Sequence, residues 1–310
     1  MVGGRAIILQ LDDTTICKPL IPQELDIYTT LPDLLRPFVP KFKDFVDFKW
    51  KRGCVRCRIR VNPSSGNMEI QGSSGPATFE DCEEGGSGLH NPWLQYCHRK
   101  QPPQSRRFLV LEDLTAGLHR PCVLDLKMGI RQYGDHDTLV KIHRKQARAA
   151  STTSCCLGLR MCGMQVFQVD TNKYVCYNKY YGRTLSQEGF RQVLYRFLHN
   201  GIQLRNDVIT ELQEVLQALV RAIRKLDSFR FFCSSLLIVY DGLAQASNGL
   251  QGSAAAHVRL IDFAHSTHAG LNTSPTYEGP DEGLIFGLTN LIALLTSIRE
   301  EGSGLVSTQP

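Results

Sequence analysis

The chain has 310 residues, of which 42% are hydrophobic and 21% are charged, and its formal net charge is +5. This composition excludes global disorder, and the length is sufficient for two lobes with substantial cores. The longest apolar runs, 234–240 and 284–295, are too short or too interrupted by polar residues to span a bilayer, and no charged and apolar leader opens the chain. We therefore expect a soluble protein of the cytoplasm or nucleus.

The eleven cysteines are too few for a dense disulfide framework, and several lie inside apolar runs where a reduced, buried thiol is typical: Cys122, Cys162, Cys176 and Cys233. A reducing compartment fits this use. A second group leaves a zinc site open, because paired cysteines and further ligands are present: Cys54, Cys57, Cys82, Cys97 and His98. Their spacing is irregular and favours reduced thiols in loops.

In the first third of the chain, the alternating residues 5–18 predict a hairpin that turns at Asp12-Asp13 and places Lys18 on a strand. A helix is expected over 23–35, and short strands over 51–59 and 68–71. The segment 72–88 is rich in Gly, Ser and acids and is expected to be mobile. Residues 108–111 predict a buried strand that continues through Glu112, Asp113 and Leu114 as a crossing between lobes.

The remaining elements predict a sheet with helices packed on it. Helical spacing of apolar residues indicates amphipathic helices over 187–198 and 207–228, after a helix over 138–150. Paired strands are expected over 163–168 and 173–180, and further strands over 231–240 and 258–263, joined by a linker rich in Gly, Ala and Ser.

The stretch 121–129 (PCVLDLKMG) is a strand that carries an acid and a base at alternate positions. Because successive side chains on a strand point to opposite faces, Asp125 and Lys127 share one face and Leu124, Leu126 and Met128 can pack on the other. An ordinary surface ion pair is the alternative interpretation.

A helix face with four cations follows this strand. Lys141, Arg144, Lys145 and Arg148 have the spacing i, i+3, i+4 and i+7, which places them on one side of a helix. Such a face attracts a polyanion, although a solvated helix surface is the alternative.

Phosphoryl transfer from ATP needs cations on the phosphates, a carboxylate for magnesium and a surface for adenine. Lys18 on its strand is a candidate for the phosphates, or else an exposed strand lysine. Asp262 ends the apolar strand 258–263, where a carboxylate is costly unless it meets a cation. Asp262 is therefore a candidate magnesium ligand, with a turn or capping role as the alternative.

Three motifs in order, 121–129 (PCVLDLKMG), 234–237 (SSLL) and 261–263 (IDF), resemble the inositol polyphosphate kinase family. Within it the chain is most similar to the inositol hexakisphosphate kinases, over about residues 3–299. The supporting stretches are 90–93 (HNPW), 131–135 (RQYGD), 162–166 (CGMQV), 178–183 (NKYYGR) and 262–265 (DFAH). The linker 242–257 is shorter and less acidic than is usual in that family.

The resemblance implies an α+β fold of two lobes, distantly like a protein kinase, with antiparallel sheets and a helical insertion that binds the inositol phosphate. Residues 1–112 would form the nucleotide-binding N-lobe and 113–310 the C-lobe, in which 131–160 contacts the inositol phosphate. Asp125 and Lys127 would be catalytic, and Asp262 with Ser235 would hold Mg²⁺. ATP would meet Lys18, Glu112, Asp113 and Leu114, and the inositol phosphate Lys127, Lys179 and the four cations of 141–148.

The implied reaction is phosphorylation of a phosphate group of inositol hexakisphosphate by ATP. A phosphomonoester has a second pKa of about 6, so this acceptor is ionised near neutral pH and needs no general base. The nearest alternative is a multikinase acting on hydroxyls of lower inositol phosphates, for which Asp125 becomes the general base. A catalytically inactive binding module fits the complete Asp125, Lys127 and Asp262 set less well, and nucleic-acid binding ranks lower because the basic stripe lacks interleaved aromatics. We expect a monomer.

Smaller expectations concern side chains near these motifs. Trp93 and the pair Tyr180-Tyr181 are expected to pack rather than to stack on bases. His265, which follows Asp262 by three residues, is either a phosphate contact or a structural histidine.

Overall fold

The computed structural model describes residues 8–49, 57–61, 68–72, 105–243, 256–271 and 275–304. These residues fall into two compact units. The first contains 8–20 and the described part of Lys41–Asp113, and the second contains Ile21–Pro40 and the described chain from Leu114. The expected lobes divided the chain once, at 112/113, whereas the structure assigns 21–40 to the second unit. Most of the segment 72–88 lies outside the described residues, as do the candidate zinc ligands' side chains.

The first unit is built on a four-stranded antiparallel sheet in the order β1-β2-β6-β3. Its strands are β1 (Leu9–Asp12), β2 (Thr15–Pro19), β3 (Phe42–Lys49) and β6 (Ser105–Glu112), and a separate hairpin pairs β4 (Cys57–Val61) with β5 (Met68–Gly72). The predicted hairpin is confirmed, but its turn is Asp13-Thr14, one residue later than expected, because Asp12 still pairs with Thr15. The Asp12 carboxylate accepts hydrogen bonds from the Thr14 N–H and hydroxyl. Strand β3 was not predicted, because Lys and Asp interrupt its apolar residues.

The segment 21–40 forms helix α1 (Pro22–Thr30) and a 3₁₀ turn, η1 (Asp33–Phe38), instead of the single helix expected over 23–35. The helix ends because Leu31 precedes a proline and takes an extended conformation. Its buried side contacts Phe263, two residues after strand β11 (His257–Ile261). The Phe263 N–H donates to the Glu24 carboxylate, and Tyr28 packs edge-on against the Phe263 ring. These contacts explain why the segment belongs to the second unit.

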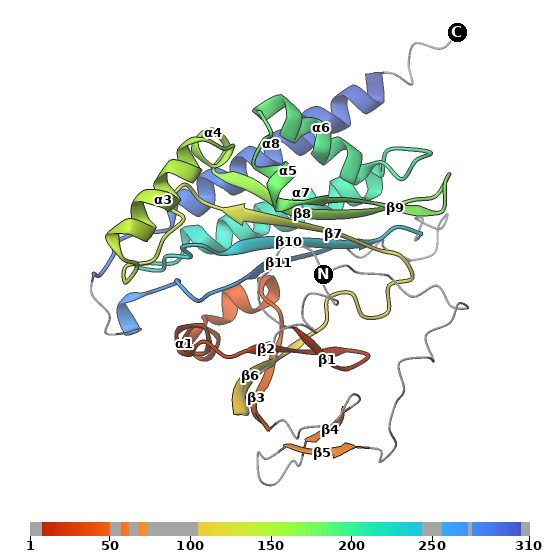
Figure 1. Ribbon diagram of the computed structural model, residues 1–310. Helices are drawn as coiled ribbons and strands as arrows, with labels where there is room; N and C mark the ends of the chain where they lie inside the picture. Colours follow the sequence, from red (N-terminus) through yellow and green to blue (C-terminus); the bar gives the residue numbers. More distant parts are fainter. Residues whose placement is uncertain are drawn as a thin grey trace. The chain divides into compact units, whose positions relative to one another are not determined.

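A five-stranded antiparallel sheet in the order β11-β10-β7-β8-β9 forms the centre of the second unit (Figure 1). Its strands are β7 (Pro121–Met128), β8 (Leu159–Gln168), β9 (Lys173–Asn178), β10 (Ser235–Asp241) and β11 (His257–Ile261). The predicted pairing of 163–168 with 173–180 is confirmed, although the second strand ends at Asn178. Strand β7 lies in the middle of the sheet, which fixes the positions of its side chains on both faces.

The helices of the second unit are α3 (Leu139–Ala150), α4 (Ser154–Leu157), α5 (Lys179–Gly182), α6 (Gln187–Leu198), α7 (Asn206–Arg224) and α8 (Glu282–Gly304), with a short 3₁₀ turn η2 (Ala269–Leu271). Helix α6 has its predicted bounds, and the Ser186 hydroxyl caps it by accepting the Gly189 N–H. Helix α6 packs on β8, and α8 packs on α7 and β7 (Figure 1). The buried leucine and isoleucine side chains of α7 and α8 form the core behind the sheet.

Helix α8 differs from the expectation drawn from its sequence. Its span Glu282–Glu301 has a mean hydropathy of 1.3 and is, by length and composition, the one described helix that meets the criteria for crossing a membrane. In the fold, Leu288, Leu291 and Leu295 are fully buried within the second unit. A single helix of this kind is weak evidence for a span, because the core helix of a globular domain has the same composition.

The described cysteines are free thiols. Cys122 and Cys233 are buried as expected, Cys162 is half-buried, and Cys176 is exposed. The expectation for Cys176 was wrong because β9 is an edge strand of the sheet. The Tyr180-Tyr181 pair is also more exposed than expected, since Tyr180 retains 64% of its accessible surface.

Candidate active site

Strand β7 places Asp125 and Lys127 on one face of the five-stranded sheet. Leu124, Leu126 and Met128 are almost fully buried on the other face, which α8 covers. The predicted alternation is therefore confirmed. It brings the acid and the base together on the face away from the helical core.

The Lys127 ammonium joins residues from three strands. Its Nζ lies 3.2 Å from the Ser235 Oγ and 3.3 Å from the Asp262 Oδ2. Ser235 is opposite Lys127 on β10, and Asp262 directly follows β11. Burial lowers the pKa of Lys127, but the charges of Asp262 and Asp125 outweigh it and hold the pKa above its ordinary value. The lysine is therefore a fixed positive charge.

Asp262 reaches this position through an unusual backbone conformation. Its φ is +67°, in the left-handed region that residues other than glycine rarely adopt. Aspartate and asparagine tolerate this region better than other side chains do. The turn directs the carboxylate toward Lys127 immediately after the strand ends.

Asp125 is a buried carboxyl with an unsatisfied atom. Only 5% of its surface is exposed, and its Oδ1 has no hydrogen-bond partner. Burial raises its pKa to about 6, against the opposing attraction of the Lys127 charge. Gly163 lies opposite it on β8, where a β-bulge inserts Cys162 between the residues paired with Asp125 and Leu126. The residue opposite Asp125 on β8 thus has no side chain, and the Asp125 Oδ1 is an open acceptor.

Arg160 is a cation of this site that sequence reasoning missed. It is directly opposite Lys127 on β8, is only 7% exposed, and lowers the pKa of Asp125 by its charge. Its guanidinium also lies 3.5 Å from the hydroxyls of Thr152, which follows α3, and Ser154, which begins α4. The available signal was an arginine inside an otherwise apolar strand, because a charge so placed requires partners.

His265 connects the motif 262–265 with the motif 131–135 through a contact with Gly134. Its ring packs so closely on Gly134 that a Cβ at that glycine would lie 2.5 Å from the histidine Nδ1. Burial lowers the pKa of His265, and the charges of Lys145, Lys127 and Lys141 lower it further. A neutral imidazole therefore lies among three ammonium groups, which come from β7 and α3.

Helix α3 carries the predicted cationic stripe, but its members are not equivalent. Lys141 and Arg144 are exposed and Arg148 is half-buried. The Lys145 Nζ instead lies 2.6 Å from the buried Asp137 carboxylate, which also accepts the Gly134 N–H. Lys145 thus joins α3 to the loop that supports His265, in addition to its charge.

Lys179 is at the margin of this site. It begins α5 directly after Asn178, which pairs with Gly163, the residue opposite Asp125. Two strand spacings of about 4.8 Å separate it from Asp125 along the sheet. Its ammonium lies 5.6 Å from the Tyr180 ring centroid.

The nucleotide residues that the resemblance implies fall in different units. Lys18 lies on β2 opposite Leu109, and Glu112 ends β6. The N–H of Glu112 donates to the Lys41 carbonyl and that of Asp113 to the Thr14 carbonyl, so both are engaged within the first unit. Leu114 belongs to the second unit.

The donor atoms around Lys127 fit a magnesium ion. Asp125, Asp262 and Ser235 offer oxygen atoms, which hard divalent cations prefer, and the Asp125 Oδ1 lacks a partner. Among the residues with described side chains, no cluster of three or more His, Cys, Asp or Glu could hold a metal by itself. This suits an ion held by one or two carboxylates and completed by substrate phosphates.

Comparison with known proteins shows what this arrangement belongs to. The family model of inositol polyphosphate kinases matches residues 108–296. Inositol hexakisphosphate kinase 3 of Mus musculus is 38% identical, covering 96% of this chain and 93% of that protein. Inositol hexakisphosphate kinase 3 of Homo sapiens is 34% identical (96% and 94%), and inositol hexakisphosphate kinase 1 of Homo sapiens 33% identical (97% and 92%).

A solved structure shows the same fold. The inositol phosphate multikinase Ipk2 of S. cerevisiae, in complex with ADP and Mn²⁺, aligns with a TM-score of 0.61 at 21% identity, covering 92% of this chain and 98% of that one. The predicted α+β architecture is therefore confirmed. Together, the family match and the extent of the identities show that this chain belongs to the inositol polyphosphate kinase family.

Proposed function

We propose that this protein is an ATP-dependent inositol hexakisphosphate kinase, which forms a diphosphoinositol pentakisphosphate and ADP. The observation that carries the proposal is the Lys127 ammonium between the carboxylates of Asp125 and Asp262, on a sheet flanked by the cations of α3. The named relatives that match almost the whole chain are inositol hexakisphosphate kinases. The roles of Lys18, Glu112, Asp113 and Leu114 toward ATP rest on the resemblance and stay predictions.

In the proposed reaction, an ionised phosphate oxygen of the acceptor attacks the γ-phosphorus of ATP. One P–O bond forms, and the bond to the β-phosphate oxygen breaks, so ADP leaves with its electron pair. Lys127 neutralises charge on the transferred group, while Lys141, Arg144 and Arg148 neutralise charge on the acceptor. The charges of Asp262 and Asp125 keep Lys127 protonated, and Arg160 on the adjoining strand adds a second positive charge to this face.

A bound Mg²⁺ would neutralise charge on the β- and γ-phosphates of ATP. Asp262 and Ser235 are the residues we propose to hold it. The unpartnered Oδ1 of Asp125 could bind the ion directly or accept a hydrogen bond from a water on the ion. Because Lys127 contacts both Asp262 and Ser235, the lysine also fixes these oxygens before the nucleotide arrives.

A second candidate is a multikinase that phosphorylates hydroxyls of lower inositol phosphates. The pKa of Asp125, which burial raises to about 6, favours it because a carboxylate with that pKa is an effective general base near neutral pH. The two candidates therefore make different demands on this carboxyl.

The deciding experiment incubates the protein with ATP, Mg²⁺ and either inositol hexakisphosphate or an inositol trisphosphate, and resolves the products. We expect a diphosphate product from the hexakisphosphate. In Asp125→Asn this turnover falls less than about tenfold, whereas transfer to a hydroxyl falls about 10²- to 10⁴-fold when its general base is lost. Turnover on the trisphosphate alone would establish the second candidate in place of the first.

The free state of the described cysteines supports a further proposal, that the protein works in a reducing compartment of the cell.

A further inference from the structure

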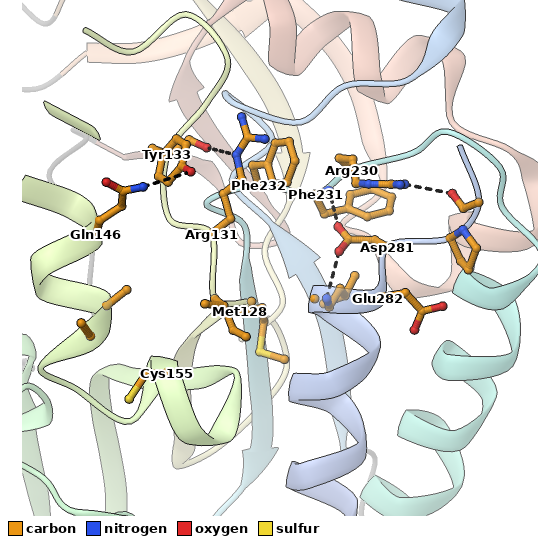
Figure 2. A pocket seen from close by; sticks show the side chains of 18 of the residues that line it. Met128, Arg131, Tyr133, Gln146, Cys155, Arg230, Phe231, Phe232, Asp281 and Glu282 are labelled. Atoms are coloured by element: carbon orange, nitrogen blue, oxygen red, sulfur yellow. Dashed lines mark hydrogen bonds between the residues drawn. The ribbon is translucent and has the colours of Figure 1, made fainter. Parts of the chain in front are cut away.

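A cavity of about 730 Å³ lies in the second unit, beside the active site but lined by other residues. Its walls come from the loop after β7, the C-terminal half of α3, the start of α4, and the segments that precede β10 and α8 (Figure 2). The volume is in the range of pockets that hold a small molecule. Neither the Asp125 carboxyl nor the Lys127 ammonium lines it.

The charges around this cavity disfavour an anion. Its two arginines already donate N–H groups to acceptors of the protein: Arg131 to Asp135, Tyr277 and the Tyr133 carbonyl, and Arg230 to the carbonyls of Phe229, Glu278 and Gly279. Three acids also line the cavity, namely Glu278, Asp281 and Glu282. Inositol phosphates and nucleotides are therefore unsuited to this cavity.

Aromatic and apolar groups form the surface that remains. Figure 2 shows the rings of Tyr133, Phe231 and Phe232 at the upper part of the cavity and Met128 below them. The Arg131 guanidinium lies 3.9 Å from the Phe232 ring centroid and 4.7 Å from that of Tyr133, so one cation contacts both rings. Flat, polarisable surfaces of this kind favour a planar aromatic ligand.

Two elements of the active site also wall the cavity. Met128 and Gly129 directly follow Lys127, and the buried Gln132 amide donates to the carbonyls of both, at 2.6 and 2.7 Å. On α3, the lining residues Gln146 and Ala150 lie on the side opposite the cationic stripe and Ala149 lies between the two sides, since each residue of a helix turns by about 100°. A ligand here would contact the backs of both elements.

We propose that this cavity binds a small, non-anionic aromatic molecule and that its occupancy changes the affinity for the inositol phosphate. The second part rests on the proposed function, whereas the first part does not. Linkage requires the reciprocal effect, so the inositol phosphate changes the affinity for the aromatic ligand by the same factor.

The test uses indole as the neutral probe and indole-3-carboxylate as its anionic counterpart, with binding to the full chain followed by saturation-transfer NMR without ATP. Ala150→Trp fills the cavity from an exposed position, and Ala147→Trp adds the same ring to the same helix outside the lining. Thermal unfolding checks that both variants fold.

We expect indole to bind the wild-type protein and Ala147→Trp equally, and to bind Ala150→Trp at least fivefold more weakly. Indole-3-carboxylate should bind the wild-type protein at least fivefold more weakly than indole does. Unchanged binding to Ala150→Trp, equal binding of the two probes, or no binding of indole would each overturn the proposed site.

Coupling is measured separately by calorimetry, as the Kd of inositol hexakisphosphate with and without saturating indole. We expect a shift of at least threefold in the wild type and none in Ala150→Trp. An unchanged Kd in the wild type would overturn the coupling while leaving the site. Failure of inositol hexakisphosphate to bind at all would instead refute the proposed function, because the indole measurements do not depend on it.

Discussion

Lys127→Met is the substitution that tests the active site most directly, because it removes the ammonium and keeps most of the apolar stem. The lost charge is the one that lies between Asp125 and Asp262. Removing one positioned electrostatic group from an active site typically lowers kcat by about 10²- to 10³-fold. We expect a loss of this size with both substrates at saturating concentration.

The cost in stability is bounded by the acids left behind. Asp125 can discharge by taking a proton, and with a pKa of about 6 this costs about 1.4 kcal/mol at pH 7, since one pKa unit is worth about 1.36 kcal/mol. Losing Lys127 raises that pKa further and reduces the cost. At about 2–4 °C per kcal/mol, the midpoint of thermal unfolding should fall by less than about 6 °C.

The assay compares kcat and the unfolding midpoint with those of Lys173→Met, which removes an exposed lysine from strand β9 of the same sheet. The control should leave both values unchanged. A kcat of Lys127→Met within tenfold of wild type would refute the role of its charge. A fall in kcat that only matches the loss of folded protein would do the same.

Three further results are expected. Lys141→Ala combined with Arg148→Ala should raise the KM for the inositol phosphate about 10- to 100-fold in steady-state kinetics, because two charge-assisted contacts are lost. The KM for ATP should stay nearly constant, and equal effects on both constants would contradict the prediction. Gly134→Ala should destabilise the protein by about 1–3 kcal/mol and raise the KM for the inositol phosphate, because the new Cβ displaces His265; unchanged unfolding and kinetics would show that the ring moves freely. Burial raises the pKa of Asp207, but the hydrogen bonds and charge of the Arg205 guanidinium outweigh it and hold the pKa below its ordinary value. The contribution of Asp207 to stability is therefore present above pH about 4 and is lost as the pH falls through the folded-state pKa. Asp207→Asn should reduce this loss of stability at acid pH in denaturation curves, and an unaltered acid dependence would refute the assignment.

Local patterns predicted the elements that place the central pair. Alternation of period two was sufficient to put Asp125 and Lys127 on one face, because burial of the intervening residues fixes the register of a central strand. The same reasoning failed for strand β3 (Phe42–Lys49), where charged residues obscure the apolar positions. Local pattern thus worked best in the middle of the second unit's sheet.

Contacts between distant segments lay beyond the sequence. The position of Arg160 beside Lys127 depends on the pairing of β8 with β7 and on the bulge at Cys162; Gly163 in this strand signals a bulge, but it does not give the partner strand. The contact between Gly134 and His265 joins residues that are far apart in the chain. The motifs 131–135 and 262–265 could each be recognised in the sequence, but Gly134 is required because the His265 ring packs against it, and this contact is visible only in the fold.

The left-handed backbone of Asp262 determines how this acid should be replaced. Alanine at a φ of +67° adds backbone strain of about 1–2 kcal/mol while it removes the charge, so a loss of activity in Asp262→Ala would have two causes. Asparagine tolerates the same conformation and has nearly the same shape. Asp262→Asn is therefore the informative variant, and a comparison of Asp262→Ala with Asp262→Gly, which both lack the carboxylate, isolates the backbone strain.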